Sequence, residues 1–362
     1  MQPPAAQQQL QRAPVQAPAA QQPNAQPAPA ARVNPAVVAP PTQTRDAREF
    51  IRREGQGPAP HIDQLRQERQ TTREGNTTFI REGDRTIVRE GNRTIIRHND
   101  ANRFAIGARN VQTERRGVNS DTTVELGNGT RVVSETDAEG RLLRRTRRDP
   151  NGREIVIIDN SFAYRRGAAP MFLQLAPPVI RIPRNRYILD ADGAGFDDIY
   201  GVLEEPPVEL VDQPYTLDQV LYNAPLRDRM PRVDLDINFE LGSWQLTPDQ
   251  VDRLSVIADA INRMLQRNPR EVFTIEGYTD AVGNEDDNLS LSDRRAESVA
   301  VALTEQFQVP PENLVTQGYG EQYLKVPTQG PERLNRRVAV RRITPLIDQQ
   351  AANVPPPPPP PR

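Results

Sequence analysis

The chain has 362 residues, of which 36% are hydrophobic and 5% aromatic, while 36 are proline. This composition argues against a single globule that buries the whole length, so we expect part of the chain to be disordered. The 46 basic and 48 acidic side chains nearly cancel, which argues against a dedicated nucleic-acid-binding protein. Because cysteine is absent, disulfides, thiolate nucleophiles, cysteine-bound zinc and a lipid-modified cysteine are excluded.

Membrane and export signals are also missing from the sequence. No apolar stretch approaches the roughly 20 residues that a spanning helix needs. The start, "MQPPAAQQQLQRAP", lacks the charged beginning and apolar run of a secretion signal, so we expect an export signal to be supplied from outside this chain. His61 and His98 lie in weakly structured sequence, and histidine-based acid–base catalysis is therefore not predicted.

Both ends of the chain are rich in proline. Residues 1–44 contain no Asp or Glu and are dominated by Ala, Gln and Pro, a composition that cannot bury enough apolar surface to offset the ordering entropy. We predict a disordered tether there, followed by a linker over 45–72 that can be helical. Residues 347–362 are predicted to be a disordered tail with a polyproline run, and the alternative is a docking site for a proline-recognising partner.

Residues 73–104 hold an internal repeat of eight residues, which reads "REGNTTFI", "REGDRTIV", "REGNRTII" and "RHNDANRF". Gly-Asn and Gly-Asp pairs recur at the turns, and β-branched runs lie between them. Beyond residue 104 the eight-residue spacing is less regular, but turn glycines and strand-like runs continue. Residues 73–170 are therefore predicted to be an arginine-rich region of successive antiparallel hairpins. The sequence leaves open whether these form one sheet, a solenoid or a loose ribbon.

Four arginines cluster in the hairpin region: Arg144, Arg145, Arg147 and Arg148. They suit contact with phosphate, nucleic acid or an acidic glycan. The alternative is that arginines on an open sheet face keep the sheet soluble and its edges unpaired. No aromatic stacking residues interleave with them, which weakens the nucleic-acid interpretation.

Residues 171–231 are predicted to be an acidic, proline-rich connector with short helical turns. Thr216 and Gln219 suit a capped turn. The connector also carries four aspartates that could suggest calcium: Asp190, Asp192, Asp197 and Asp198. They lack the spacing and the closing bidentate glutamate of a calcium loop, which favours solvated acids and no metal site.

Beyond residue 232 strands and helices alternate. Thr247 is predicted to cap a helix that begins at Pro248 and is ended by Asn268-Pro269, with Gln250 closing a capping box. A second helix is predicted over about 290–307, and strands over 233–240, 271–279, 314–320 and 336–343. The fold class is therefore α+β: a C-terminal βαβαβ sandwich, with helices on one face of a mixed sheet, follows the hairpin region and the disordered arm.

The C-terminal unit also carries a multi-part motif. The segment "EGYTDAVGNEDDNLSLSDRRAESVAVAL", followed by "VTQGYGE" and "NRRVAV", resembles the OmpA-like peptidoglycan-binding domain of outer-membrane proteins, Pal lipoproteins and MotB-type stator proteins. The resemblance covers about a third of the chain, residues about 232–345, within a predicted domain at 232–346. The matching positions are Thr279-Asp280, Gly283, Asn288, Leu291-Ser292, Arg295-Ala296 and Asn335-Arg336-Arg337-Val338.

The resemblance implies a ligand and its contacts. In the family the ligand is the diaminopimelate residue of the peptidoglycan stem peptide. By this resemblance Asp280 would contact its amine or a nearby backbone amide, and Arg295 its carboxylate. Asn288 and Arg336 would add hydrogen bonds, and Thr279 belongs to the same site. The loop 321–334 is about two residues shorter than is common in the family and is expected to border the groove.

The residue types support the same chemistry independently. Asp280 is predicted in a strand-to-helix loop and Arg295 in the first turns of the next helix, so both side chains can point into one groove. A carboxylate suits an ammonium group, and a planar guanidinium can take a carboxylate bidentately. The alternative is that Asp280 and Arg295 pair with each other. Arg294 and Arg337 are interpreted as solvated, and Trp244 as a partly buried anchor.

The sequence contains no nucleophile with a base, no metal cage and no phosphate loop, so we predict neither an enzyme nor a cofactor. The first hypothesis is a periplasmic envelope protein that binds peptidoglycan non-covalently and is associated with the outer membrane. Its arm and hairpin region would contact the outer membrane or envelope proteins, with no nucleic-acid partner. The alternative hypothesis makes the arginine-rich hairpins an adhesive or scaffolding surface for acidic polymers, with the C-terminal domain as an anchor only.

Overall fold

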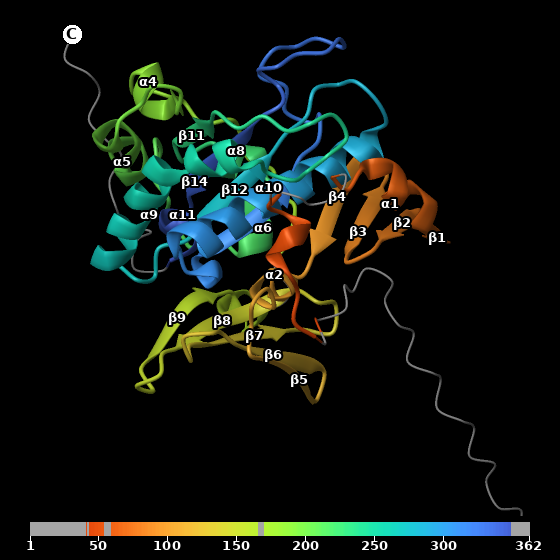
Figure 1. Ribbon diagram of the computed structural model, residues 1–362, viewed down its shortest axis with the longest axis vertical. Coiled ribbons are helices and arrows are strands. Elements are labelled where there is room, and N and C mark those ends of the chain that lie inside the picture. Colours follow the sequence, from red (N-terminus) through yellow and green to blue (C-terminus); the bar gives the residue numbers. More distant parts are fainter. Residues whose placement is uncertain (1–40, 42, 54–58, 166–169, 349–362) are drawn as a thin grey trace, which may run out of the picture. The chain divides into compact units, whose positions relative to one another are not determined.

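The computed structural model describes residues 41, 43–53, 59–165 and 170–348. The predicted tether, apart from residues 41, 43 and 44, and the polyproline run lie outside the described residues. Within this part the strands form three sheets (Figure 1), one of four strands and two of five. No helix among the described residues has the length and apolar character needed to cross a bilayer.

The first three units of the eight-residue repeat fold as part of an antiparallel meander, as their pattern predicts, whereas the fourth unit, residues 97–104, ends in a short helix. Each strand pairs with the next along the chain, and the turn glycines have positive φ. The sheet consists of β1 (Gln70–Glu74), β2 (Thr77–Glu82), β3 (Arg85–Glu90) and β4 (Arg93–His98). The linker before it includes a 3-10 turn, η1 (Ala47–Glu49), and the helix α1 (Ile62–Glu68).

A short helix, α2 (Ala101–Phe104), interrupts the hairpins, so they form two separate sheets. The second sheet is again an antiparallel meander in chain order. It consists of β5 (Asn110–Arg116), β6 (Asn119–Glu125), β7 (Arg131–Thr136), β8 (Leu142–Arg148) and β9 (Glu154–Asp159), and α3 (Ser161–Arg165) follows it. This answers the question that the sequence left open about the arrangement of the strands.

Residues 171–231 form several short helices and one strand of the C-terminal sheet. Thr216 and Gln219 make the predicted capping box at α6. The elements are α4 (Arg184–Tyr187), β10 (Ile188–Asp190), α5 (Phe196–Glu204), α6 (Leu217–Tyr222) and α7 (Ala224–Arg227). Strand β10 pairs in parallel with β11 (Arg232–Leu235), so it extends the sheet of the following domain.

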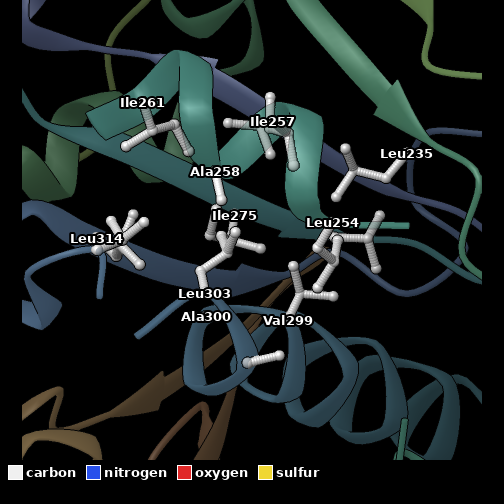
Figure 2. Close-up of a cluster of buried hydrophobic side chains, with 14 of the residues drawn as sticks. Leu235, Leu254, Ile257, Ala258, Ile261, Ile275, Val299, Ala300, Leu303 and Leu314 are labelled. Carbon is white, nitrogen blue, oxygen red and sulfur yellow. The ribbon is translucent and has the colours of Figure 1, made fainter. Parts of the chain in front are cut away.

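The C-terminal sheet is mixed and has the order β10-β11-β14-β12-β13. Its remaining strands are β12 (Phe273–Gly277), β13 (Leu314–Gly318) and β14 (Val338–Arg342), and η2 (Pro311–Asn313) and α11 (Thr344–Ile347) complete the described chain. Apolar side chains of α9 (Ser255–Arg267) and α10 (Glu285–Phe307) pack with those of β11, β12 and β13 in one core (Figure 2). A second core includes α6, α7 and α11 and the strand side chains of the opposite face, such as Val315.

The larger differences from the sequence prediction concern one helix that is divided, one strand end and one helix start. The helix predicted between Pro248 and the stop at Asn268-Pro269 is divided into α8 (Pro248–Asp252) and α9. The capping box there is not formed, because the Gln250 side chain accepts from the backbone N–H of Asn238 and the Thr247 hydroxyl donates to Asp249. Strand β11 ends at Leu235, since the chain then leaves the sheet for a long loop. Helix α10 begins at Glu285, where the Asn284 side chain caps it.

A buried set of ion pairs joins the first sheet to α10. Arg85 of β3 is fully buried, and its guanidinium contacts Asp293 (Nε to Oδ2, 2.8 Å) and Glu297. His98 of β4 approaches Asp293 within 3.1 Å, and Ser290 donates to Glu82. Burial alone would lower the pKa of His98, but Asp293 and Asp100 outweigh it and raise that pKa to about 10. These charges depend on one another, because each would be costly to bury alone.

Replacing Arg85 with methionine should destabilise the protein. The change leaves Asp293 and Glu297 buried without their main counter-charge, and breaking one side of a buried pair costs about 3–5 kcal/mol. We expect urea denaturation to show a free energy of unfolding lower by about 3 kcal/mol. Arg115→Met removes an exposed arginine of β5 and should change it by less than about 0.5 kcal/mol. Equal effects of the two substitutions would contradict the proposed importance of the buried set.

The stability should also depend on pH through His98. Its pKa rises from an ordinary value of 6.5 to about 10 on folding, so the folded state binds the proton more tightly than the unfolded state. The contribution of protonated His98 to the free energy of unfolding is complete below a pH of about 6.5. It is lost as the pH rises toward about 10, and the loss is at most about 1.4 kcal/mol per pH unit. Urea denaturation at several pH values should show this fall in the native protein and a smaller one in His98→Gln. An identical fall in both would refute the assignment.

Candidate ligand-binding site

The predicted site residues lie where β12 ends and α10 begins. Gly277, the last residue of β12, lies directly against α10: a Cβ atom there would be 1.9 Å from the carbonyl oxygen of Ser292. Only glycine therefore allows this close packing of helix on strand. Thr279 and Asp280 follow, and the backbone N–H of Thr279 donates to the carbonyl of Gly320. The tight packing fixes the start of α10 relative to the ends of β12 and β13.

Asp280 is buried and already has a positively charged partner. Its Oδ2 atom accepts from Nη1 of Arg336 at 2.6 Å and from the backbone N–H of Glu332 at 3.3 Å. The Arg336 side chain remains 43% exposed. The pair between Asp280 and Arg295, which the sequence left open as an alternative, is not among the ion pairs of the structure; Arg336 takes that place.

Arg295, on α10, is 5% exposed and close enough to Asp280 for their charges to interact. Its Nε donates to the carbonyl of Ser243 at 3.0 Å and its Nη2 to that of Glu240 at 3.2 Å. Within the described part of the chain, no carboxylate lies within ion-pair distance of this guanidinium. Burial and the nearby Arg336 lower the pKa of Arg295 to about 10, so the side chain still carries its charge at neutral pH. A buried cation whose hydrogen bonds go to carbonyl oxygens, and which lies 4.9 Å from the centre of the Phe239 ring, is a favourable place for an anion.

Asn288 connects the loops around Asp280. Its Nδ2 lies within hydrogen-bond distance of the carbonyls of Asp280 (3.3 Å) and Val282 (3.1 Å), and of Oε2 of Glu321 (2.7 Å). The hydroxyl of Thr279 is buried and has no hydrogen-bond partner among the described residues. The structure therefore brings all five predicted residues to one place. Asn288 is engaged with protein groups, so it acts there by holding the loop.

The segment that contains these five residues matches a known protein family. Residues 238–337 match the model of the OmpA family. This segment is an OmpA-family domain. The chain is 28% identical over 110 residues to outer membrane porin F of Pseudomonas aeruginosa, covering 30% of each protein. It is 35% identical over 85 residues to the probable lipoprotein YiaD of Escherichia coli, covering 24% of this chain and 36% of that protein. The chain thus spans about a third of the length of these curated relatives.

Solved structures of similar domains include the peptidoglycan-associated lipoprotein of Burkholderia pseudomallei. It is 21% identical, with 29% of this chain and 86% of that chain covered and a TM-score of 0.25. The C-terminal domain of MotB from Helicobacter pylori is 24% identical, with 29% and 79% covered and a TM-score of 0.26.

Segments outside the OmpA-family domain support the loop that holds Arg295. The backbone of Leu246 exchanges hydrogen bonds with Phe50 and Arg52, and that of Gly242 accepts from Ile62, all at 2.9 Å. The side chain of Gln245 donates to the carbonyl of Arg48 at 2.8 Å. These residues carry no recognisable motif, because backbone hydrogen bonds can be made by any residue type.

Two arginines next to the motif are buried, so the interpretation that they are solvated is wrong. Arg294 donates to the carbonyl of Glu82 at 3.4 Å and lies 5.1 Å from the centre of the Trp244 ring. Arg337 lies 3.8 Å above the ring of Tyr278. Trp244 is only 3% exposed, which makes it an interior anchor that cannot stack on a sugar. The domain thus uses Arg294 and Arg337 for packing.

The arginine cluster of the second sheet is largely neutralised. Each of the four guanidinium groups has a carboxylate partner, Asp159 for Arg144, Asp100 for Arg145, Glu312 for Arg147 and Glu154 for Arg148, at 2.6 to 3.2 Å.

Among the described residues there is also no group of three or more side chains suited to a metal ion. A cavity of about 670 Å³ near Phe104 and Val309 contains none of the five predicted site residues.

Replacing Gly242 with alanine should disturb the loop that holds Arg295. Gly242 has φ of +69°, and a Cβ atom would lie 2.0 Å from the His61 ring. We expect the free energy of unfolding to fall by about 1 kcal/mol, because left-handed backbone costs about 1–2 kcal/mol per non-glycine residue. The control is Gly201→Ala in the middle of α5, where the added Cβ meets no neighbour and should be neutral or stabilising. Chemical denaturation of both variants gives the comparison.

Proposed function

We propose that this protein is a non-enzymatic component of the bacterial cell envelope that binds peptidoglycan non-covalently through its OmpA-family domain. The observation that carries the proposal is the state of Arg295, a buried, charged guanidinium without a carboxylate partner in the described part of the chain. Asp280 lies beside it with the opposite charge. This arrangement suits the zwitterionic end of a diaminopimelate residue in the stem peptide.

The contacts of the site suggest how the ligand binds. The ammonium group of the ligand replaces Arg336 at Oδ2 of Asp280, so the carboxylate never loses its counter-charge. The ligand carboxylate is bound by Arg295, and the released Arg336, whose side chain is half exposed, turns to the same carboxylate. Arg295 is already desolvated by the fold, so binding does not bear that cost again. Asn288 keeps the loop between Asp280 and α10 in position.

This function places the protein in the periplasm, bound to peptidoglycan and associated with the outer membrane. The support for this placement is the family match and the relatives, an outer membrane porin and a probable lipoprotein. The N-terminal arm and the hairpin region would contact outer-membrane or envelope proteins, and no nucleic-acid partner is proposed. We do not propose the hairpins as a surface for acidic polymers, because their clustered arginines are paired with carboxylates.

Sedimentation of the full chain with purified diaminopimelate-type sacculi tests the proposal. Asp280→Asn and Arg295→Gln should each raise the apparent Kd at least about tenfold, which is about 1.4 kcal/mol. Arg263→Gln, at an exposed arginine of α9 in the same domain, should bind like the native protein. Circular dichroism shows whether each variant is folded.

Two results would refute the proposal. One is that the native protein stays in solution with sacculi; the other is that both folded site variants sediment like the Arg263 control. Raising the salt concentration distinguishes binding at this site from non-specific attraction of exposed arginines to sacculi. Binding through the buried Asp280 and Arg295 side chains should lose little affinity for sacculi, whereas binding through exposed arginines should lose most of it.

A further inference from the structure

The cavity of about 670 Å³ lies at the C-terminal end of α10. Three parts of the chain form its walls: the last turns of α10 with the residues up to 312, the helix α2 with residues 106 and 107, and the loop between β6 and β7 with the end of β8. Small-molecule sites in proteins commonly have volumes of about 300–1,000 Å³. The cavity is therefore large enough to hold a small ligand.

Carboxylates outnumber cations in the walls of this cavity. The charged side chains that line it are Asp149, Glu305 and Glu312 on one side of the balance and Arg103 and Arg147 on the other. The cavity also lies against the end of a 23-residue helix, where the backbone carbonyls carry a partial negative charge. Both contributions favour a positively charged ligand.

The two guanidinium groups already have partners in the protein. Arg147 pairs with Oε1 of Glu312 at 3.2 Å. Nη2 of Arg103 donates to the carbonyl of Leu314 at 2.6 Å and lies 3.7 Å from the carboxylate of Asp100. Neither arginine is therefore left to balance the charge of Glu305.

Glu305 is the carboxylate without a counter-charge. It forms no ion pair with the part of the chain that the structure describes, and its Oε1 atom would lie 3.9 Å from a Cβ atom on Gly107 in the opposite wall. Burial raises the pKa of Glu305, and the charge of Arg53 does not offset this effect. A cation in the cavity would stabilise the ionised form of this side chain.

The walls also contain acceptor atoms that lack a donor. Glu312 is only 1% exposed, and its Oε2 atom has no hydrogen-bond partner among the described residues. The same holds for Oδ1 of Asp149 and for the hydroxyl of Thr304. Buried carboxylate oxygens without donors are costly, so N–H groups of a ligand would be favoured here.

The spacing of these groups indicates an extended ligand. Among the described residues no three acidic side chains are close enough to hold one metal ion, so a single ion cannot serve Asp149, Glu305 and Glu312 together. Between them the wall is apolar, with Ile106, Leu126 and Val309. A chain of methylene groups that carries ammonium groups at intervals fits both features, because its apolar part is removed from water against these side chains.

We propose that this cavity binds an aliphatic polyamine. Its ammonium groups interact with Glu305, Asp149 and Glu312, and its methylene groups pack against the apolar wall. The site is separate from Asp280 and Arg295, neither of which lines the cavity, so it would be a second binding activity that does not depend on peptidoglycan.

Calorimetry of the full chain with spermidine tests the proposal. Hexane-1,6-diol, which has a methylene chain but no charge, should not bind detectably. Magnesium ions should bind at least about tenfold more weakly than spermidine, since they cannot span the carboxylates. Tri-lysine carries the same ammonium groups on a bulkier backbone and should also bind at least about tenfold more weakly.

Two variants examine the charge and the space separately. Glu305→Gln removes the unpaired charge at an exposed position and should weaken spermidine binding at least about tenfold. Gly127→Leu should weaken it to a similar extent by filling the cavity, because Gly127 lines the cavity and a Cβ atom there meets no neighbour. The control is Glu90→Gln, at an exposed glutamate of β3, which should bind like the native protein. Circular dichroism shows whether each variant is folded.

Several results would overturn the polyamine site. If the native protein does not bind spermidine, or binds magnesium as tightly, the cavity does not recognise an extended cation. If folded Gly127→Leu binds like the native protein, spermidine binds outside the cavity, and if Glu305→Gln does so, its charge is not recognised. An equal loss in Glu90→Gln would show general attraction to acidic side chains, and equal binding of tri-lysine would make a protein segment the ligand instead.

Discussion

The charges buried on helix α10 are the constraint on which the described structure depends. Asp293 and Glu297 lie on its buried surface, and α10 can bury them only if cations reach them from elsewhere in the chain. Arg85 and His98 of the first sheet supply these cations. The hairpin repeat is therefore joined to the OmpA-family domain by charges that neither part could bury alone. This coupling makes the two parts a cooperative unit.

The same helix connects stability to the site. One side of α10 carries the ion pairs with the first sheet, and Arg295, two residues after Asp293, faces the loop 239–246. That loop is itself held by residues near Phe50 and Ile62. The buried guanidinium is thus kept in place from both sides by parts of the chain outside the family segment. A site with a desolvated cation needs such support, because an unsupported loop would admit water and weaken the charge interaction.

Much of the fold could be predicted from the sequence, and the wrong predictions of helix and strand boundaries have clear physical causes. The repeat predicted its meander because glycine at each turn and β-branched residues between turns are local signals. Helix α10 begins earlier in the structure than its apolar stripe predicts. Asn284 and the acidic residues after it favour the start of a helix, but they are polar and so do not extend the apolar pattern. The sequence pattern did not predict the division between α8 and α9 or the end of β11 at Leu235. Both involve the loop that follows β11, whose Asn238 donates to Gln250 of α8, and such contacts leave no local sequence pattern.

The sequence alone determined the α+β class and the succession of antiparallel hairpins, and its motif marked the five residues that lie near the end of β12. It did so because periodicity, turn residues and motif spacing act over short distances along the chain. The tertiary structure alone decided which charges are paired. Arg336, not Arg295, reaches Asp280, and Arg85 meets Glu297 from 212 positions away. Ion pairs are set by where folded segments meet, and an arginine looks the same in the sequence whether it will be buried, paired or solvated.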